Sequence, residues 1–386
     1  MKILISSGSF KDVFSSAEAC EMIKGILPES AVCSVQPVCD GGEYTFDILR
    51  SFYGGKARVI NVRNVINPYG RPVDVSYLAV DNAAFVVSSE ILHLSLEEDE
   101  YKNPLELSDF GLGQLIADAI EKGFRDIRLC LGGTSTVGYG IGVAQALGAE
   151  LSGYDSEKPI CPADFHEITS IDFHPERFRD IKLSVINDGI TRACDLDIVT
   201  PLKVGLAFAS EKASILKRID EECDNIYKVT GLTVNDPWSG NAGGVYFGVQ
   251  NMFSCEYFKG SDYFCDLFGL NEKIAQSDLV ITGEGRFDNP RLKKIPVTVC
   301  ERAKAQGKPV IFMCGQIAPE WAEIAENPAE GVYIIPELKE QYSIEKILSC
   351  TDYYESRNIP ASPEVFKEYT PIILKERLSS CQTCFH

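Results

Sequence analysis

The sequence has no uninterrupted apolar run of the roughly 18 residues that a membrane-spanning helix requires. Residues 1–6 form a short strand pattern and lack the long apolar segment of an export signal. Only 4 histidines occur, and His93, His166 and His174 share no metal-ligand spacing, so we expect ordinary core or surface residues. A Gly-x-Ser-x-Gly segment is absent too, which leaves a hydrolase triad without its nucleophile turn. We therefore expect a cytoplasmic protein with no membrane partner.

Basic residues are scarce as well, since 37 Lys and Arg stand against 56 Asp and Glu, giving a net charge of −19. Such a surface repels nucleic acid and anionic lipid, so neither is an expected partner. An anionic small-molecule substrate would then require local Lys or Arg side chains at its site. The sequence leaves assembly into a homo-oligomer open.

Apart from one close pair, the 14 cysteines lie singly, as in the apolar segments 129–131 and 299–300. Without an export signal, they are expected to be reduced thiols of the core. One close pair, Cys381 and Cys384, precedes His386 at the end of the chain. A metal or redox site would need further ligands nearby, so we expect a frayed tail there.

Strand and helix patterns alternate at both ends of the chain, which predicts a parallel sheet. From residue 279 onward the predicted order is strand 279–282, helix 296–306, strand 309–313, helix 319–326, strand 331–335 and helix 343–350. Nearer the N-terminus, three Val-rich runs are spaced like an antiparallel meander, at 57–65, 73–80 and 84–87.

The length of 386 residues favours two domains. We predict an α/β fold with a discontinuous parallel-sheet domain of the flavodoxin or Rossmann type. Residues 1–65 and 275–386 are assigned to this domain, and residues 66–274 to a large inserted α+β domain.

Residues 278–288, Asp-Leu-Val-Ile-Thr-Gly-Glu-Gly-Arg-Phe-Asp, are the most informative segment. A short apolar strand, Leu279–Ile281, ends at Thr282-Gly283, and Glu284, Arg286 and Asp288 follow. Glycines at the carboxyl end of a buried strand let a ligand approach the backbone, and open α/β sheets bind ligands there. The segment predicts a loop that binds a phosphorylated or metal-bound ligand. A glycine-rich turn with a surface ion pair is the alternative.

Glycine-rich loops follow predicted strands at residues 40–43, 132–142 and 283–285, and a fourth opens a helix at 239–244. Backbone N–H groups at a helix N-terminus form an anion site. None of the four matches the P-loop or the dinucleotide fingerprint, and each alone is equally consistent with a tight turn. Four in one chain favour phosphate binding. The candidate binding residues in these loops are Asp40, Gly41, Gly42, Glu43, Gly132, Gly133, Thr134 and Gly283.

Charged residues in loop contexts complete the candidate site. Phosphoryl transfer needs positioning and charge neutralisation, with Mg²⁺ and an orienting carboxylate. The available cations are Lys11, Arg286, Lys293 and Lys294, and the available acids are Asp40, Glu43, Asp188, Glu284 and Asp288. Adjacent Lys293 and Lys294 are equally consistent with the solvated start of a helix.

In this order, the motifs resemble those of the type II glycerate kinases, which phosphorylate D-glycerate with ATP and Mg²⁺. The resemblance extends from residue 1 to about residue 315. The matching segments are Ser9-Phe10-Lys11, residues 40–45, Asn103-Pro104-Leu105, Gly111-Leu112-Gly113, residues 131–134, residues 145–149, Ala242-Gly243-Gly244, residues 278–288, and Lys294 with Pro296.

Several polar positions depart from the family pattern. Gly8 and Asp12 replace an Asp and a Gly of the first motif, and an Asn-Asp pair is missing within residues 136–140. In the segment 188–192 only Asp188 keeps its acid, and one residue is missing before Lys294.

The resemblance implies a kinase that phosphorylates glycerate or a closely related small hydroxy acid, with ATP and Mg²⁺ as cofactors. It implies that Lys11 and Arg286 hold phosphate or the substrate carboxylate, with Ser9 and Lys294 beside them. Asp188 becomes the candidate base, while Glu284 and Asp288 become the candidate Mg²⁺ ligands. Asp40 and Glu43 would join them in binding the metal or orienting the attacking hydroxyl.

The missing acids keep two alternatives open. One is a family paralogue that binds a nucleotide or an organic acid without transfer, as a sensor or partner subunit. The other is a kinase that acts on a different hydroxy acid.

Overall fold

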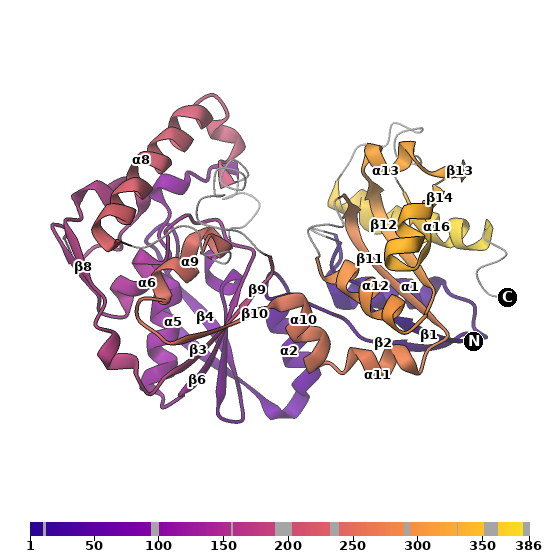
Figure 1. Ribbon diagram of the computed structural model, residues 1–386, viewed down its shortest axis with the longest axis horizontal. Coiled ribbons are helices and arrows are strands. Elements are labelled where there is room, and N and C mark those ends of the chain that lie inside the picture. The colour runs from indigo at the N-terminus through magenta and orange to yellow at the C-terminus, as the bar shows by residue number, and fades with distance from the viewer. Residues whose placement is uncertain are drawn as a thin grey trace. The chain divides into compact units, whose positions relative to one another are not determined.

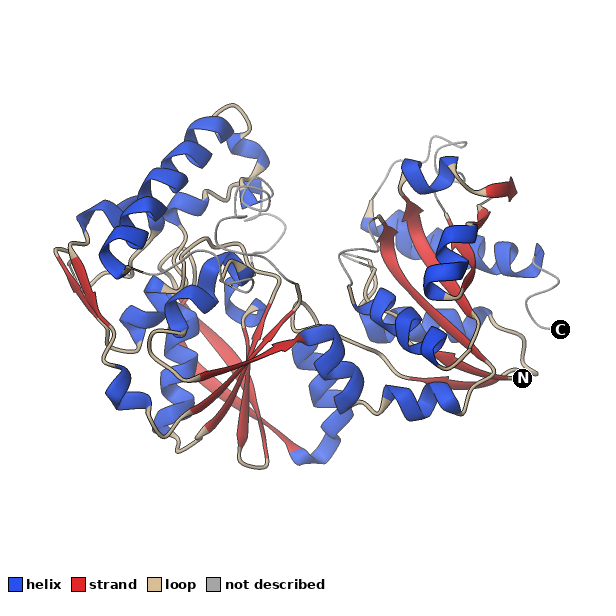
Figure 2. Cartoon of the chain, in the orientation of Figure 1, coloured by secondary structure: helices blue, strands red, loops and turns tan. Residues whose placement is uncertain are grey.

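The computed structural model describes residues 1–10, 13–93, 100–155, 157–189, 203–231, 239–288, 294–329, 331–350 and 362–380. The chain divides into two compact units. Unit 1 comprises Met1–Asp40 and Ser261–His386, and unit 2 comprises Gly41–Gly260. Figure 1 labels the elements, and Figure 2 shows that the sheet of each unit carries helices on its faces.

Unit 1 is built on a seven-stranded sheet with the order β13-β14-β15-β12-β11-β1-β2. Its strands are β1 (Lys2–Ile5), β2 (Val32–Val35), β11 (Leu279–Phe287), β12 (Val310–Ile317), β13 (Glu326–Ala329), β14 (Val332–Ile334) and β15 (Ile344–Ser349). The pairs from β2 to β15 are parallel, and β14 is antiparallel to both its neighbours. The prediction of an α/β fold with a discontinuous parallel sheet is therefore confirmed.

Helices cover both faces of this sheet. They are α1 (Ser16–Ile26), α10 (Gly260–Leu267), α11 (Leu270–Ala275), α12 (Ile295–Ala305), α13 (Pro319–Glu323), α14 (Pro336–Tyr342) and α16 (Pro363–Ser380). Alternate strand residues such as Ile5, Ile281 and Met313 share one core cluster with residues of α1 and α16. Helix α12 contacts β11 and α14, so its side of the sheet receives the other set of strand residues.

The strand β15 corrects a sequence prediction, because residues 343–350 were expected to be a helix. The structure instead ends helix α14 at Tyr342 and pairs Ile344–Ser349 in parallel with β12. Ile344, Ile347 and Leu348 have the spacing of a helix face, yet all three are buried in a central strand. Strands buried on both faces carry near-continuous apolar runs, so this periodicity was ambiguous.

Unit 2 contains a six-stranded sheet with the order β10-β9-β6-β5-β4-β3. Its strands are β3 (Ala57–Ile66), β4 (Pro72–Val80), β5 (Ala83–Val87), β6 (Asp126–Leu131), β9 (Lys182–Asn187) and β10 (Cys255–Lys259), beside a small hairpin of β7 (Glu150–Ser152) and β8 (Ser170–Asp172). The predicted meander is confirmed as β3, β4 and β5, which are antiparallel. From β5 to β10 the pairs are parallel, so the carboxyl ends of β5, β6 and β9 lie at one edge.

The helices of unit 2 are α2 (Thr45–Tyr53), α3 (Ser89–Leu92), α5 (Phe110–Glu121), α6 (Ile141–Ala146), α8 (Lys212–Thr230) and α9 (Asn241–Val249). Apolar residues of α5, α6 and α9 share one core cluster with alternate residues of the sheet. Helix α5 approaches β3 so closely that a Cβ on Gly111 would lie 2.1 Å from the carbonyl oxygen of Ile66. Glycine is therefore required at this contact.

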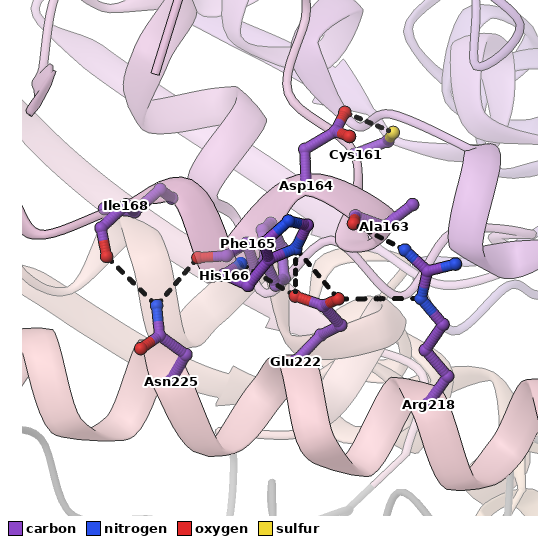
Figure 3. Close-up of polar contacts among 9 residues, drawn as sticks. All are labelled: Cys161, Ala163, Asp164, Phe165, His166, Ile168, Arg218, Glu222 and Asn225. Atoms are coloured by element: carbon purple, nitrogen blue, oxygen red, sulfur yellow. Dashed lines mark hydrogen bonds and ion pairs between the residues drawn. The ribbon is translucent and has the colours of Figure 1, made fainter. Parts of the chain in front are cut away.

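Helix α8 covers a separate apolar cluster of unit 2, together with the 3-10 helix η3 (Pro162–Glu167). Figure 3 shows how polar side chains of α8 bind the backbone of this segment. Glu222 accepts a hydrogen bond from the backbone N–H of His166 at 2.7 Å, and Asn225 donates to the carbonyl oxygen of Phe165 at 2.7 Å. These bonds hold α8 over Tyr139, whose hydroxyl lies 2.8 Å from that of Tyr227.

The unit boundaries lie earlier than the predicted ones at 65/66 and 274/275. Residues 41–65 belong to unit 2 because β3 pairs with β4 and α2 contacts both strands. Helices α10 and α11 belong to unit 1 because they are tied to α12, where Arg302 pairs with Asp262 and Asp266.

Each of the 11 cysteines within the described residues is a free thiol. Burial raises the pKa of Cys20 and Cys255 to about 12, and raises those of Cys130, Cys300 and Cys314 further. Neutral buried thiols behave as small apolar side chains. Across the described residues, none of the helices has the length and apolar character needed to cross a bilayer.

The close approach of α5 to β3 gives a stability prediction. Substitution Gly111→Ala should lower the free energy of unfolding by about 1–3 kcal/mol, because the added methyl group overlaps a backbone carbonyl. Substitution Gly25→Ala in α1 is the matched control, since a Cβ there meets nothing within 4 Å. The free energy of unfolding of this control variant should rise by up to about 0.5 kcal/mol. Urea denaturation followed by circular dichroism measures the free energy of unfolding of both variants. A Gly111→Ala variant as stable as the wild type would contradict the close contact between α5 and β3.

A second prediction concerns Asp109, a buried residue before α5 whose carboxylate accepts hydrogen bonds from the N–H groups of Gly140 at 2.9 Å and Val143 at 3.1 Å. Substitution Asp109→Asn should cost about 1–3 kcal/mol, because an NH₂ group would then face these donors.

The pH dependence tests the same group. Burial raises the pKa of Asp109 to about 6 from 3.8, although the backbone hydrogen bonds lower it. Between these values the folded protein holds a proton that the unfolded chain has lost, so stability falls as pH rises. The stability advantage of the wild type over Asp109→Asn should therefore be smaller at pH 7.5 than at pH 4.5. A stability advantage of the wild type that grows with pH would show that the backbone hydrogen bonds lower the pKa of Asp109 more than burial raises it.

Candidate functional site

The segment that includes residues 279–287 is one continuous strand in unit 1, and this corrects the loop predicted after Ile281. β11 extends to Phe287 and pairs in parallel with β12, with Glu284 opposite Cys314 and Arg286 opposite Gln316. The glycine has a packing role, because a Cβ on Gly283 would lie 2.0 Å from the carbonyl oxygen of Met313. The charged residues therefore project from a strand, which holds them more rigidly than a loop would.

Three carboxyl groups influence one another at this end of unit 1. Burial is the largest cause that raises the pKa of Glu284 to about 7, and the charges of Asp288 and Asp40 raise it too. Lys294, the residue before α12, lowers it. Its Nζ lies 3.8 Å from Oδ1 of Asp288. Carboxylates that repel one another beside one lysine form a site that a cation would stabilise.

Other predicted residues of unit 1 lie around this group. The N–H of Gly8 donates to the carbonyl oxygen of Gly283 at 2.9 Å, and the N–H of Gly285 donates to that of Ser9 at 3.3 Å. Arg286 is exposed and lies two residues beyond Glu284 along β11, hence on the same face. Lys11 falls outside the described residues, so its predicted role stays a prediction.

Two strand ends and the segment before α2 bring a second group of predicted residues together in unit 2. A Cβ on Gly132, after β6, would lie 2.3 Å from Oδ2 of Asp188, after β9, and 2.7 Å from Cα of Gly42. Gly41 is equally close to the end of β9, since its Cβ would lie 2.9 Å from the carbonyl oxygen of Ile186. Residues 41–43, 132–134 and 188 therefore form one cluster. The parallel pairing of β6 with β9 accounts for the position of 132–134 beside 188.

The segment after β5 adds residues that the sequence analysis did not select. The hydroxyl of Ser88 donates to the carbonyl oxygen of Gly132 at 3.0 Å, and Ser89 donates to that of Gly42 at 3.4 Å. His93, expected to be an ordinary histidine, has its Nε2 3.3 Å from Oε1 of Glu43. No metal spacing marks His93, because its partner is 50 residues away in the chain.

Asp109 lies at the end of the predicted phosphate-binding loop 132–142, beside the N-terminus of the helix that follows. Its carboxylate already accepts hydrogen bonds from N–H groups at the start of α6. The loop 239–244 also has a packing role, since a Cβ on Gly243 would lie 1.9 Å from the carbonyl oxygen of Thr136. Asp109 and the loop 239–244 together fix the backbone of residues 136–142. The first part of the loop, residues 132–134, belongs to the cluster with Asp188.

Lys203 is a further residue of this cluster that the sequence analysis missed. Its Nζ donates to the carbonyl oxygen of Thr136 at 2.7 Å and to Oγ1 of Thr134 at 3.2 Å. Burial lowers the pKa of Lys203 to about 7; Asp188 and Asp109 raise it, and Lys102 lowers it. Only the fold brings this amine beside a loop 69 residues away, so no local pattern could reveal it.

Each unit thus presents a distinct chemical capacity. Unit 1 offers carboxylates with a lysine, a set that suits a divalent cation and phosphate oxygens. Unit 2 offers a carboxylate, Asp188, close to an amine and to hydroxyl groups, a set that suits a small hydroxylated anion.

Comparison with known proteins gives the family. Residues 3–353 match the model of the glycerate kinase family. A glycerate kinase of Bacillus subtilis (strain 168) is 30% identical over 356 residues, which cover 87% of this chain and 90% of that protein. A glycerate 2-kinase of Escherichia coli (strain K12) is 30% identical over 357 residues, covering 87% and 90%.

A solved structure agrees on the fold. A crystal structure from Salmonella typhimurium LT2, described as a glycerate kinase 2, superposes with a TM-score of 0.67 at 23% identity and covers 99% of this chain and 98% of that one. The family model extends over most of the chain, from β1 to beyond β15. This protein therefore belongs to the glycerate kinase family of phosphotransferases.

Proposed function

We propose that this protein transfers the terminal phosphoryl group of ATP, with Mg²⁺, to a hydroxyl group of glycerate or of a closely related small hydroxy acid. Relatives that match 87% of the chain carry the names glycerate kinase and glycerate 2-kinase. The observation that carries the proposal is the group of Glu284, Asp288 and Asp40 with Lys294 in unit 1. Phosphoryl transfer depends on such positioned charges far more than on covalent chemistry.

The donor set of unit 1 fits Mg²⁺. This ion prefers oxygen ligands and usually takes one or two carboxylates together with water and substrate phosphates. Within the described residues there is no cluster of three or more His, Cys, Asp or Glu that would enclose a metal. Glu284 and Asp288 would therefore hold the ion with help from the nucleotide, and the bound ion would neutralise charge on the transferred phosphoryl group.

The remaining residues of unit 1 have roles that follow from their charges. Lys294, which pairs with Asp288, is proposed to bind a phosphate oxygen. Arg286 is exposed on the same strand face as Glu284 and is proposed to do the same. Ser9, whose backbone is bonded to Gly285, would supply a hydroxyl beside them.

Within unit 2, Asp188 is proposed to orient the attacking hydroxyl and accept its proton. Its carboxylate is half-buried against Gly132, so its position is fixed while part of it remains accessible. Glu43, placed beside His93, and the backbone of residues 132–134 would complete the acceptor side.

The first prediction tests Glu284 with an assay of ADP release from ATP and Mg²⁺ over a panel of small hydroxy acids led by D-glycerate. Substitution Glu284→Gln should lower kcat by about 10²- to 10³-fold, because a charge is removed from a pre-organised site. Glu272→Gln, an exposed residue of α11, is the matched control and should leave kcat unchanged.

The same assay separates the alternatives. Full turnover in Glu284→Gln would refute its role. Turnover with an acid other than glycerate would keep the chemistry and change the acceptor. No turnover by the wild type, with ATP or D-glycerate still bound in calorimetry, would favour a non-catalytic family member.

The second prediction tests Asp188. Substitution Asp188→Asn should lower kcat by about 10²- to 10⁴-fold with a smaller change in the KM for D-glycerate, since the isosteric amide cannot accept the proton. Asp81→Asn is the control in the same unit, because this exposed turn residue has φ 50°, which Asn also tolerates. A KM increase without loss of kcat would instead show that Asp188 only binds the acceptor.

A further inference from the structure

The amine of Lys203 is incompletely used by the protein. A lysine ammonium has three N–H donors, and two of them go to the carbonyl oxygen of Thr136 and to Oγ1 of Thr134. Within the described residues, no carboxylate lies within ion-pair distance of its Nζ, and the third donor has no partner. The side chain is half-buried, so a small ligand can still reach it.

The position of Lys203 relates it to the acceptor side of unit 2. Thr134 follows Gly132 and Gly133 at the end of β6, and Gly132 is in contact with Asp188 at the end of β9. The Oγ1 atom of Thr136 is buried and has no hydrogen-bond partner within the described part of the chain. A cation with a free donor thus lies against a short loop that carries an unpartnered hydroxyl group. Such polar groups are where an anionic ligand gains most.

We propose that Lys203 binds the carboxylate of the acceptor acid, with Asp188 placed to meet a hydroxyl group of the same molecule. This inference rests on the proposed function, because it takes the acceptor to be a small hydroxy acid. It gives the acid group a specific partner that no sequence motif indicates.

The local charges favour a carboxylate over the phosphates of a nucleotide. Among the described residues, the charged groups that act on Lys203 are Asp188, Asp109 and Lys102. Two carboxylates therefore oppose two amines, which leaves little positive charge to balance a triphosphate. A single carboxylate requires only the one charge that a protonated Lys203 supplies.

Binding should then be linked to proton uptake. Burial lowers the pKa of Lys203 to about 7, so at pH 8 most of the free protein carries the neutral amine. A bound carboxylate favours the ammonium form and raises this pKa. Acid binding should therefore take up close to one proton at pH 8 and much less at pH 6, where the amine is already protonated.

Isothermal titration calorimetry of the full-length protein tests this in two buffers with different ionisation heats. D-Glycerate and the rest of the hydroxy-acid panel are titrated at pH 8 and pH 6, with glycerol as the analogue that lacks the carboxylate. Substitution Lys203→Met should weaken acid binding by about 10- to 100-fold and abolish proton uptake, without changing the response to glycerol. Lys203→Arg keeps a cation that does not titrate, so it should restore most of the affinity but no uptake. Lys56→Met, an exposed site in unit 2, is the control and should match the wild type.

The outcomes separate this inference from the proposed function. Wild-type affinity and proton uptake in Lys203→Met would overturn it, and so would the absence of binding of every acid of the panel to the wild type. Loss of ATP binding with acid binding retained would assign Lys203 to phosphate and also overturn it. Acid binding with Lys203-dependent uptake but no phosphoryl transfer would uphold the inference while the proposed function fails. Circular dichroism of each variant confirms that the comparison is made on folded protein.

Discussion

The proposed acceptor side of this protein depends on one buried carboxylate. Asp109 accepts hydrogen bonds from N–H groups at the turn into α6, and this fixes the backbone of residues 138–143. The same loop is also held by the close contact of Gly243 with Thr136. Tyr139 within the loop packs against the rings of Tyr227 and Phe247. Thr134 and Thr136 lie just before the fixed segment, so the placement of Lys203 follows from it. The protein thus fills with its own carboxylate an anion site that a ligand would otherwise occupy.

Local strand and turn patterns predicted much of the fold. The parallel sheets and the β3–β5 meander were predictable because strand runs with turn residues between them were distinct. The strand β15 was not, because Ile344, Ile347 and Leu348 match a helix face as well as a doubly buried strand. The extension of β11 through Gly283–Arg286 was missed for a related reason. Glycine usually marks a turn, but here it allows two strands to approach closely.

In the candidate site, too, some residues could be predicted from the sequence and others could not. Residues that follow neighbouring strands, such as Gly132 and Asp188, could be grouped from sequence because parallel strands end at one edge. Lys203, His93 and Asp109 could not, because each acts on a loop many residues away and has no flanking signature. The properties of Lys203 and Asp109 come from burial and charge, which depend on tertiary structure. Sequence therefore identifies the location of a candidate site more readily than the side chains that set its electrostatics.

The buried cysteines have a consequence for how this protein's unfolding can be followed. Thiol reagents attack the thiolate, and burial both blocks access and disfavours that form. Cys20, Cys300 and Cys314 lie in unit 1, whereas Cys130 and Cys223 lie in unit 2. Alkylation of each cysteine, mapped by mass spectrometry, would therefore report the opening of its own unit. The natural sequence already carries site-specific probes for whether the two units unfold together or separately.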